Sequence, residues 1–316
     1  MKQLQGIHHV TAISGDAQKN LNFYSGVLGL RLVKKTVNFD DPGSYHLYYG
    51  DRAGTPGTVV TFFAWPGAGR GKTGVGEPVT LAFRVPAGSL DYWQKRLLAA
   101  GYVPQTGSVR WRARILKVSD PDGLNVELVE STQQANPALE TKHWPNAGIP
   151  EAYAVQGIES VSLSHTDLGG SRELFTSGFG FQHTDGNDER MRYAVGPSFV
   201  DVIKAREDRQ GRMGAGTIHH LAFRVPDDDA QKQWQQQLAR LGLNVSPVMD
   251  RNYFHSIYFR EPDGVLFEIA TDLPGFDIDE PAETLGQTLK LPAWYEPQRP
   301  LLEARLPKLV VPEVRA

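Results

Sequence analysis

The chain has 316 residues, a formal net charge of −3 and a pI near 6.3, and 40% of its residues are hydrophobic. This balance is typical of a soluble globular protein without a basic stripe, so we expect neither nucleic acid nor a membrane as a partner. The sequence holds no cysteine, which excludes disulfides and thiolate chemistry, and it shows no signal segment or membrane-spanning apolar run, which predicts a cytoplasmic protein.

The first strand-like segment carries two consecutive histidines. GIHHVTAIS at 6–14 reads as a strand, and a helix is predicted around 21–28, ending at Gly29, a residue type common at helix C-termini. Residues 45–51 and 57–65 then read as further strands. We call this first copy of the pattern module 1.

The same order of elements returns twice in the middle of the chain. In module 2, residues 78–86 are a predicted strand, 90–101 a helix, and 119–130 a turn and a strand. Residues 135–156, rich in proline and alanine, read as a linker. Module 3 opens with GIESVSLSH at 157–165 and continues with a short helix and the strands MRYAVG and SFVDVIK. The helix of module 3 is predicted around 172–176.

Module 4 shows the pattern most clearly. TIHHLAFRV at 217–225 is a predicted strand with a second histidine pair, and 227–242 is a helix with acidic residues in its first turn. Strands are expected at 244–248, 254–259 and 264–270, the last two joined by an EPDG turn.

A curved four-stranded unit of this kind cannot bury its concave face alone, so the modules must pair. We therefore predict an α+β fold in which four βαβββ modules pair into two cup-like mixed β-sheets flanked by helices. The predicted domains are 1–134 with modules 1 and 2, a linker at 135–156, 157–272 with modules 3 and 4, and a loop-rich C-terminal arm at 273–316.

The repeat indicates which residues stand at equivalent inward positions. The first strands carry His9, Thr80, Ser160 and His220, and the last strands carry Thr61, Glu127, Asp201 and Glu268. If modules 1 and 4 share a cup, that cup holds two imidazoles and one carboxylate, a set typical of non-haem Fe(II) sites with open positions for O2 and substrate. The cup of modules 2 and 3 has no imidazole, so we expect it to hold no metal.

Structural roles remain the alternative for each of these residues. A lone histidine on a strand is more often a hydrogen-bonded structural residue than a ligand, and a one-residue shift in register would exchange His9 and His220 with the preceding His8 and His219. Glu268 lies in the otherwise apolar run VLFEIA, where a buried carboxylate needs a partner.

These segments resemble the vicinal oxygen chelate superfamily, which is built from paired βαβββ modules. The phrases IHHVT, YHLYYGDRAGTPGTVVTFF, GTIHHLAFRVPD and DRNYFHSIYFREPDGVLFEIATDLPGF are similar to those of ring-cleaving dioxygenases that act on hydroquinone and chlorohydroquinone. The resemblance covers nearly the whole chain. It implies Fe(II), or Mn(II), held by His9, His220 and Glu268, with an aromatic diol and O2 as substrates. Whether the protein forms a homo-oligomer stays open.

The same resemblance implies roles for the pocket residues. Those expected around the metal are His8, Thr11, His219, Arg251 and Tyr258, with Thr11 contacting the substrate. Arg251 would stabilise negative charge, although a solvated charge after a turn explains it equally well, and Tyr258 would donate to a bound phenolate, with core packing as the alternative. His219 or His255 would act as acid or base. His255 replaces an acid of the chlorohydroquinone enzymes, so the ring substituents stay open.

Two other functions share this fold. A lyase or isomerase of the glyoxalase I type normally holds its metal with four protein ligands, and Thr61 stands where the second carboxylate is expected. A non-enzymatic small-molecule binding protein would lack the metal-ligating triad.

Overall fold

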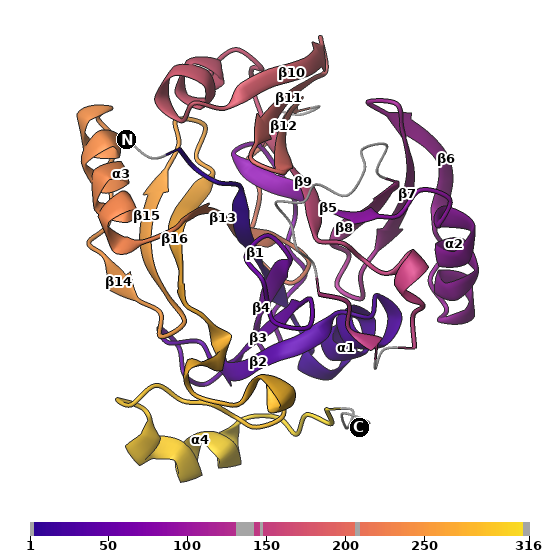
Figure 1. The fold of residues 1–316 in the computed structure, drawn as a ribbon, viewed down its shortest axis with the longest axis vertical. Helices are drawn as coiled ribbons and strands as arrows, with labels where there is room; N and C mark the ends of the chain where they lie inside the picture. Colours follow the sequence, from indigo (N-terminus) through magenta and orange to yellow (C-terminus); the bar gives the residue numbers. More distant parts are fainter. Residues whose placement is uncertain (1–2, 131–141, 146–147, 206–208, 312–316) are drawn as a thin grey trace.

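The computed structural model describes residues 3–130, 142–145, 148–205 and 209–311. The first part of the predicted linker therefore lies outside the described residues. Two mixed sheets of eight strands each make up most of the described chain (Figure 1).

The first sheet has the strand order β14-β15-β16-β13-β1-β4-β3-β2. Its strands are β1 (Ile7–Ser14), β2 (Arg31–Val37), β3 (Tyr45–Gly50), β4 (Val59–Ala64), β13 (Ile218–Val225), β14 (Met249–Asp250), β15 (Phe254–Arg260) and β16 (Leu266–Pro274). The sheet thus joins module 1 to module 4 through the antiparallel pair of β1 and β13.

The second sheet has the order β10-β11-β12-β9-β5-β8-β7-β6. Its strands are β5 (Glu77–Val85), β6 (Gln105–Arg110), β7 (Ala113–Ser119), β8 (Asn125–Glu130), β9 (Ile158–His165), β10 (Gln182–Asn187), β11 (Arg190–Val195) and β12 (Ser198–Lys204). Modules 2 and 3 meet here through β5 and β9.

The first and last strands of every module pair in parallel, as β1 with β4, β5 with β8, β9 with β12 and β13 with β16. A parallel pair requires a crossover, and the helical segment of each module lies in that connection. The predicted α+β fold of four βαβββ modules in two sheets is therefore confirmed. Each sheet is therefore built from one module of the first half of the sequence and one module of the second half.

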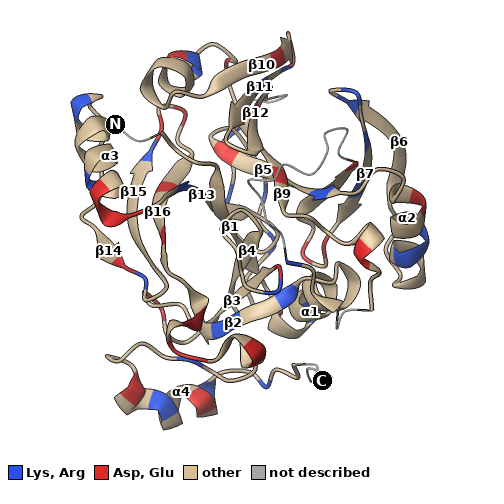
Figure 2. Cartoon of the chain, in the orientation of Figure 1, with Lys and Arg blue, Asp and Glu red and all other residues tan. Residues whose placement is uncertain are grey.

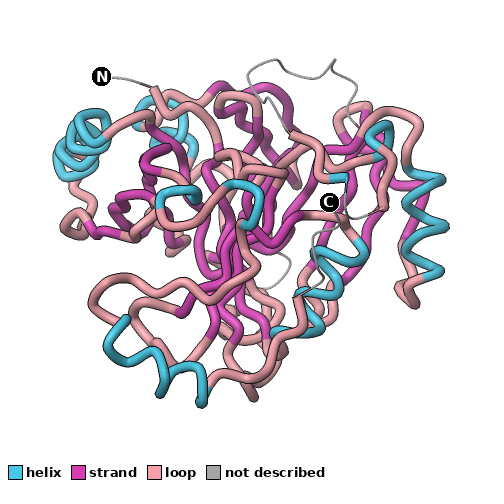
Figure 3. Tube along the Cα trace, turned by 60° about the horizontal axis from the view of Figure 1, so that its bottom comes forward, coloured by secondary structure: helices cyan, strands magenta, loops and turns pink. Residues whose placement is uncertain are grey.

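Helices lie at the periphery, around the sheets (Figure 3). The α-helices are α1 (Ala17–Leu21), α2 (Leu90–Ala99), α3 (Asp228–Arg240) and α4 (Arg299–Arg305). The short helices are η1 (Asn22–Val27), η3 (Glu151–Tyr153), η4 (Leu174–Gly178), η5 (Phe276–Ile278), η6 (Ala282–Thr284) and η7 (Glu296–Gln298). Trp93 of α2 and Trp234 of α3 are buried against the sheets and anchor these two helices.

Three local predictions need correction. The helix expected around 21–28 is a short α-helix followed by the π-helix η1, and the helix expected around 172–176 is the π-helix η4. The strand expected at 244–248 does not form, since only Val245 bridges to β15 and the ladder begins at β14. Pro247 lacks the backbone N–H that a ladder needs.

After β16, the C-terminal arm runs along the edge of the first sheet beside β2 and includes α4, after which the described chain continues to residue 311 (Figure 1). It is held by buried Lys34, whose ammonium lies 2.6 Å from Asp279 and 2.5 Å from Glu280. Helices α2, α3 and α4 each carry residues of both charges (Figure 2). Among the described residues, no helix is long and apolar enough to cross a membrane.

Candidate metal centre

Three neighbouring strands of the first sheet bring His9, His220 and Glu268 together. His9 lies on β1, His220 on the adjacent β13 and Glu268 on β16, which pairs with β13. Their exposed fractions are 2%, 5% and 0%. The sheet register therefore gathers side chains that are more than two hundred residues apart in the chain.

The ligand atoms of these three residues converge on one point. The Nε2 atom of His220 lies 2.9 Å from Oε2 of Glu268, the Nε2 atom of His9 lies 3.5 Å from the same oxygen, and the two Nε2 atoms are 3.4 Å apart. Oε2 of Glu268 is buried and makes no directional hydrogen bond in the described structure. Separations of this size suit a divalent ion bound by two imidazoles and one carboxylate. The residues present thus fit a metal.

Each histidine pair shares one hydrogen bond. Nδ1 of His8 lies 2.9 Å from Nδ1 of His9, and Nδ1 of His219 lies 2.8 Å from Nδ1 of His220. The Nδ1 atoms of the two candidate ligands are therefore occupied, which leaves their Nε2 atoms for a metal. A partner on the second ring nitrogen fixes the orientation of a ligating imidazole.

Burial favours the neutral form of His8, His219 and His220. Desolvation lowers the pKa of His8 well below its usual value and lowers that of His219 to about 3. The next histidine in the sequence, His9 or His220, lowers each pKa further. Burial also lowers the pKa of His220, although Glu268 opposes the shift. Neutral imidazole is the form that binds a metal.

Glu268 is held as a carboxylate by its neighbours. Desolvation alone would raise its pKa, but His9 and His220 together hold that pKa well below its usual value. The hydroxyl of Ser256 on β15 donates to Oε1 at 2.5 Å, which turns Oε2 toward the imidazoles. Ser256 is a site residue that the sequence analysis missed.

A cavity of about 380 Å³ opens over the triad. Its lining is rich in aromatic side chains and has a few polar groups; the residues are His9, Thr11, Asn38, Phe39, Asp40, Asp41, His46, Tyr48, Phe63, Trp65, His219, His220, Arg251, Phe254, Tyr258, Leu266 and Glu268. A volume of this order holds one substituted aromatic ring, and a mostly apolar wall with few polar groups is typical of small-molecule sites.

Arg251 and Tyr258 form a pair on one wall of the cavity. The guanidinium Nε of Arg251 donates to the hydroxyl oxygen of Tyr258 at 3.1 Å, and Nη1 lies 3.2 Å from Asp40. Since the tyrosine oxygen accepts this bond, its own proton is free to point elsewhere. Burial raises the pKa of Tyr258, and Glu268 adds to the shift, so the hydroxyl stays protonated.

Seven of the nine residues expected at the site line the cavity together: His9, His220, Glu268, Thr11, His219, Arg251 and Tyr258. His8 is buried behind His9 and packs against Phe254, with ring centroids 5.1 Å apart. His255 lies outside the cavity, where its Nδ1 is 2.7 Å from Asp228 at the start of α3. Alternation along β15 turns Ser256 and Tyr258 inward and His255 away.

His46 and Tyr48 also line the cavity, although the sequence analysis gave them no role. Both lie on β3, at positions two residues apart, so they share one face of the sheet. The alternation in YHLYYG is the only signal in the sequence that could have indicated them.

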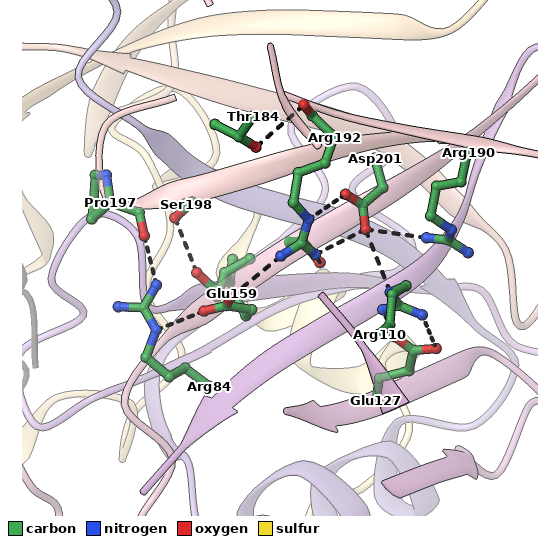
Figure 4. Close-up of polar contacts among 12 residues, drawn as sticks. Arg84, Arg110, Glu127, Glu159, Thr184, Arg190, Arg192, Pro197, Ser198 and Asp201 are labelled. Carbon is green, nitrogen blue, oxygen red and sulfur yellow. Dashed lines mark hydrogen bonds and ion pairs between the residues drawn. The ribbon is translucent and has the colours of Figure 1, made fainter. Parts of the chain in front are cut away.

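In the second sheet, ion pairs surround the carboxylates that stand at the equivalent positions (Figure 4). Arg190 and Arg192 lie 3.1 Å and 2.7 Å from Asp201, and Arg110 contacts both Asp201 and Glu127. Guanidinium groups thus neutralise these acids, and no imidazole joins them among the residues drawn.

Another group of metal-ligand type occurs where modules 3 and 4 meet. Buried His165 has Nδ1 3.2 Å from Asp263 and Nε2 3.5 Å from Glu261. The two carboxylates face different ring nitrogens, and Ser171 donates to both of them. This geometry suits a contact that joins the two modules better than a single ion.

In a comparison with known protein families, the family model "Glyoxalase/Bleomycin resistance protein/Dioxygenase superfamily" matches residues 6–128 and 157–269 of the chain. The chain is 43% identical over 307 residues to the "Putative ring-cleaving dioxygenase MhqO" of Bacillus subtilis, with 96% of both chains covered. It is 33% identical over 300 residues to the chlorohydroquinone/hydroquinone 1,2-dioxygenase of Sphingobium indicum, with 92% of both covered.

Two solved structures support the same fold. The crystal structure of a "putative dioxygenase" from Bacillus subtilis matches with a TM-score of 0.91 and 40% identity, over 99% of this chain and 100% of that one. Glyoxalase I from Zea mays matches with a TM-score of 0.60 and 16% identity, over 84% of this chain and 92% of that one, a likeness that shows the fold alone.

Proposed function

The chain belongs to the Glyoxalase/Bleomycin resistance protein/Dioxygenase superfamily, and we propose that it is a ring-cleaving dioxygenase acting on an aromatic diol at a metal held by His9, His220 and Glu268. The observation that carries the proposal is the convergence of two Nε2 atoms and one carboxylate oxygen beneath a cavity with aromatic walls. The relatives named as ring-cleaving dioxygenases support it independently.

Fe(II), or Mn(II), would supply open positions for a diol oxygen and O2 and would let electrons of the diol, which is the group oxidised, reach O2. The three protein ligands leave such positions, because Thr61 stands where a fourth ligand would come from β4. The same residue argues against a lyase of the glyoxalase I type, since a hydroxyl is a poor ligand compared with a carboxylate.

The remaining cavity residues bind and orient the diol. Phe63, Trp65 and Phe254 offer aromatic faces against which a ring can pack and exclude water. The ring centroids of Tyr258 and His220 lie 5.8 Å apart, and the Tyr258 oxygen accepts from Arg251, so its own O–H can donate to an oxygen of the diol. Arg251 behind it favours negative charge on that oxygen.

Hydroquinones are the substrate class that we favour over catechols, because the relative from Sphingobium indicum is named for hydroquinone and chlorohydroquinone. The test is O2 consumption by anaerobically purified, iron- or manganese-loaded protein with a panel of hydroquinones and catechols. We expect diol-dependent uptake that is lost in Glu268→Gln and kept in Glu127→Gln, the equivalent carboxylate of the second sheet. Absence of uptake with every diol by metal-loaded wild type contradicts the proposal.

A further inference from the structure

Four polar side chains form a continuous hydrogen-bonded chain beside the triad. Oγ1 of Thr11 lies 2.8 Å from Oγ1 of Thr61, which lies 2.8 Å from Nε2 of His46, and Nδ1 of His46 lies 2.9 Å from the hydroxyl of Tyr48. Thr11 and Thr61 are fully buried, Tyr48 is 1% exposed and His46 is 9% exposed. Every link is short enough for direct proton transfer.

The sheet register places this chain next to the metal ligands. Thr11 on β1 stands opposite His220 on β13 and opposite Thr61 on β4, and Thr61 stands opposite Tyr48 on β3. Directly opposed residues point to the same face of a sheet. A row of side chains therefore runs from His220 to Tyr48, and His46, two residues before Tyr48, lies on the same face.

His46 has the properties of a proton carrier. Both ring nitrogens are hydrogen-bonded, and the ring is fixed between Tyr48 and Phe63, whose centroids lie 4.1 Å and 4.4 Å away. Burial, with His9 and His220 next, lowers the pKa of His46 well below its usual value, so the free site holds a neutral ring. A neutral imidazole accepts a proton at one nitrogen and donates one from the other.

We propose that Thr11, Thr61, His46 and Tyr48 are the proton relay of the ring-cleaving reaction, with His46 as its central acceptor; this inference rests on the proposed function. The O–H bond of the diol breaks, its proton passes to Thr11, the proton of Thr11 passes to Thr61, and that of Thr61 forms a new N–H bond at Nε2 of His46. The Nδ1 proton then moves to the hydroxyl oxygen of Tyr48, whose own proton passes to solvent water in the cavity, which carries it away as hydronium. The diol is left as a phenolate and the relay keeps its charge.

The test uses metal-loaded protein without O2 and 4-nitrophenol, whose absorption distinguishes phenol from phenolate. At a pH below the nitrophenol's own pKa, we expect wild type to bind it as phenolate. His46→Gln keeps hydrogen-bonding groups but takes no proton, so the phenolate share of the bound ligand should fall. Turnover of hydroquinone should also fall about 100-fold in kcat with little change in KM, at the lower end of general acid–base effects.

Further variants distinguish a relay from a structural role. Tyr48→Phe leaves the acceptor but blocks the exit, so we expect phenolate formation to persist while kcat falls. Thr61→Val interrupts the chain before His46, so both readouts should fall. His183→Gln, which changes an exposed histidine of β10, is the control and should match wild type.

Phenolate formation and kcat at wild-type levels in His46→Gln would overturn the relay and leave the proposed function standing. If His46→Gln loses its metal, Thr61→Val decides, and wild-type readouts in that variant overturn the relay. A metal-loaded wild type that neither binds nitrophenol nor consumes O2 with any diol overturns the proposed function, and the relay with it.

Discussion

Replacement of Ser256 by alanine tests whether the carboxylate of the triad is held in place for a metal. The Ser256 hydroxyl is buried and donates to Oε1 of Glu268 at 2.5 Å. A hydrogen bond to a charged group contributes about 1.5–3 kcal/mol. Without it the carboxylate is free to rotate, and a metal must restrict that rotation on binding. We therefore expect the Kd for the metal to rise roughly 10- to 100-fold, as is typical for groups that orient ligands.

The assay is competition between metal-free protein and a chelator of known affinity, under anaerobic conditions. The matched control is Ser198→Ala on β12, which also removes a buried hydroxyl that donates a hydrogen bond, here to Ile158 at 3.0 Å. Both variants should lose stability toward urea, Ser198→Ala the less because its bond is to a neutral carbonyl, but only Ser256→Ala should lose metal affinity. Equal metal affinity in Ser256→Ala and wild type would refute the assigned orientation of Glu268.

Three further predictions concern other parts of the site. Glu268→Gln should abolish metal binding, because it removes the single carboxylate of the triad, whereas Glu127→Gln should keep the metal. Elemental analysis of both variants checks this, and metal loss in Glu127→Gln alone would mean that the wrong modules were assigned to the site. Arg251→Met should lower kcat/KM about 10- to 100-fold through loss of its charged bond to Tyr258, measured by steady-state kinetics, and an unchanged value would remove Arg251 from the mechanism. In the metal-free protein, the pKa of His219 in the folded state is about 3, below its ordinary 6.5, so the neutral ring's contribution to the free energy of unfolding is complete above pH 6.5 and is lost as the pH falls toward 3, by about 1.4 kcal/mol per pH unit. Urea unfolding across this pH range should show that the free energy of unfolding falls less steeply with acid in His219→Gln than in wild type, and equal slopes would contradict the shift.

The repeat made the fold and the pairing of modules predictable from the sequence. Equivalent positions in the four modules are set by one register, in which Glu268 pairs with Ala222, Glu127 with Ala82, Asp201 with Ser162 and Thr61 with Thr11. A repeated sequence segment identifies the equivalent positions of the modules even when no distance between residues is known. That is why two histidines more than two hundred residues apart could be assigned to one cup.

What the sequence left open depends on contacts between strands. The link from His46 to Thr61 joins β3 and β4, and the link from Ser256 to Glu268 joins β15 and β16, so neither appears in a single segment. Five or six residues are too few to distinguish a π-helix from an α-helix by their periodicity, which explains η1 and η4. His255 shows the opposite case: it was expected at the site as an acid or base, although alternation with Tyr258 along the same strand could have excluded it from the cavity.

The histidine pairs illustrate how local sequence carries part of a site. In each pair the second ring turns its Nε2 toward Glu268 while its Nδ1 contacts the ring before it. Adjacent residues on a strand normally point to opposite faces, yet in both pairs the Nδ1 atoms of the two imidazoles meet within hydrogen-bond distance. Under the proposed function, the pair places a metal ligand and the group that orients it within two consecutive residues.

The most direct test of the central claim is the product formed from hydroquinone under isotopically heavy O2 by the iron-loaded protein. The proposed function predicts a ring-opened acid whose mass shows that both oxygen atoms of one O2 molecule entered it, with no such product from Glu268→Gln. Recovery of intact hydroquinone, or of benzoquinone without incorporated oxygen, would contradict ring cleavage at the triad of His9, His220 and Glu268.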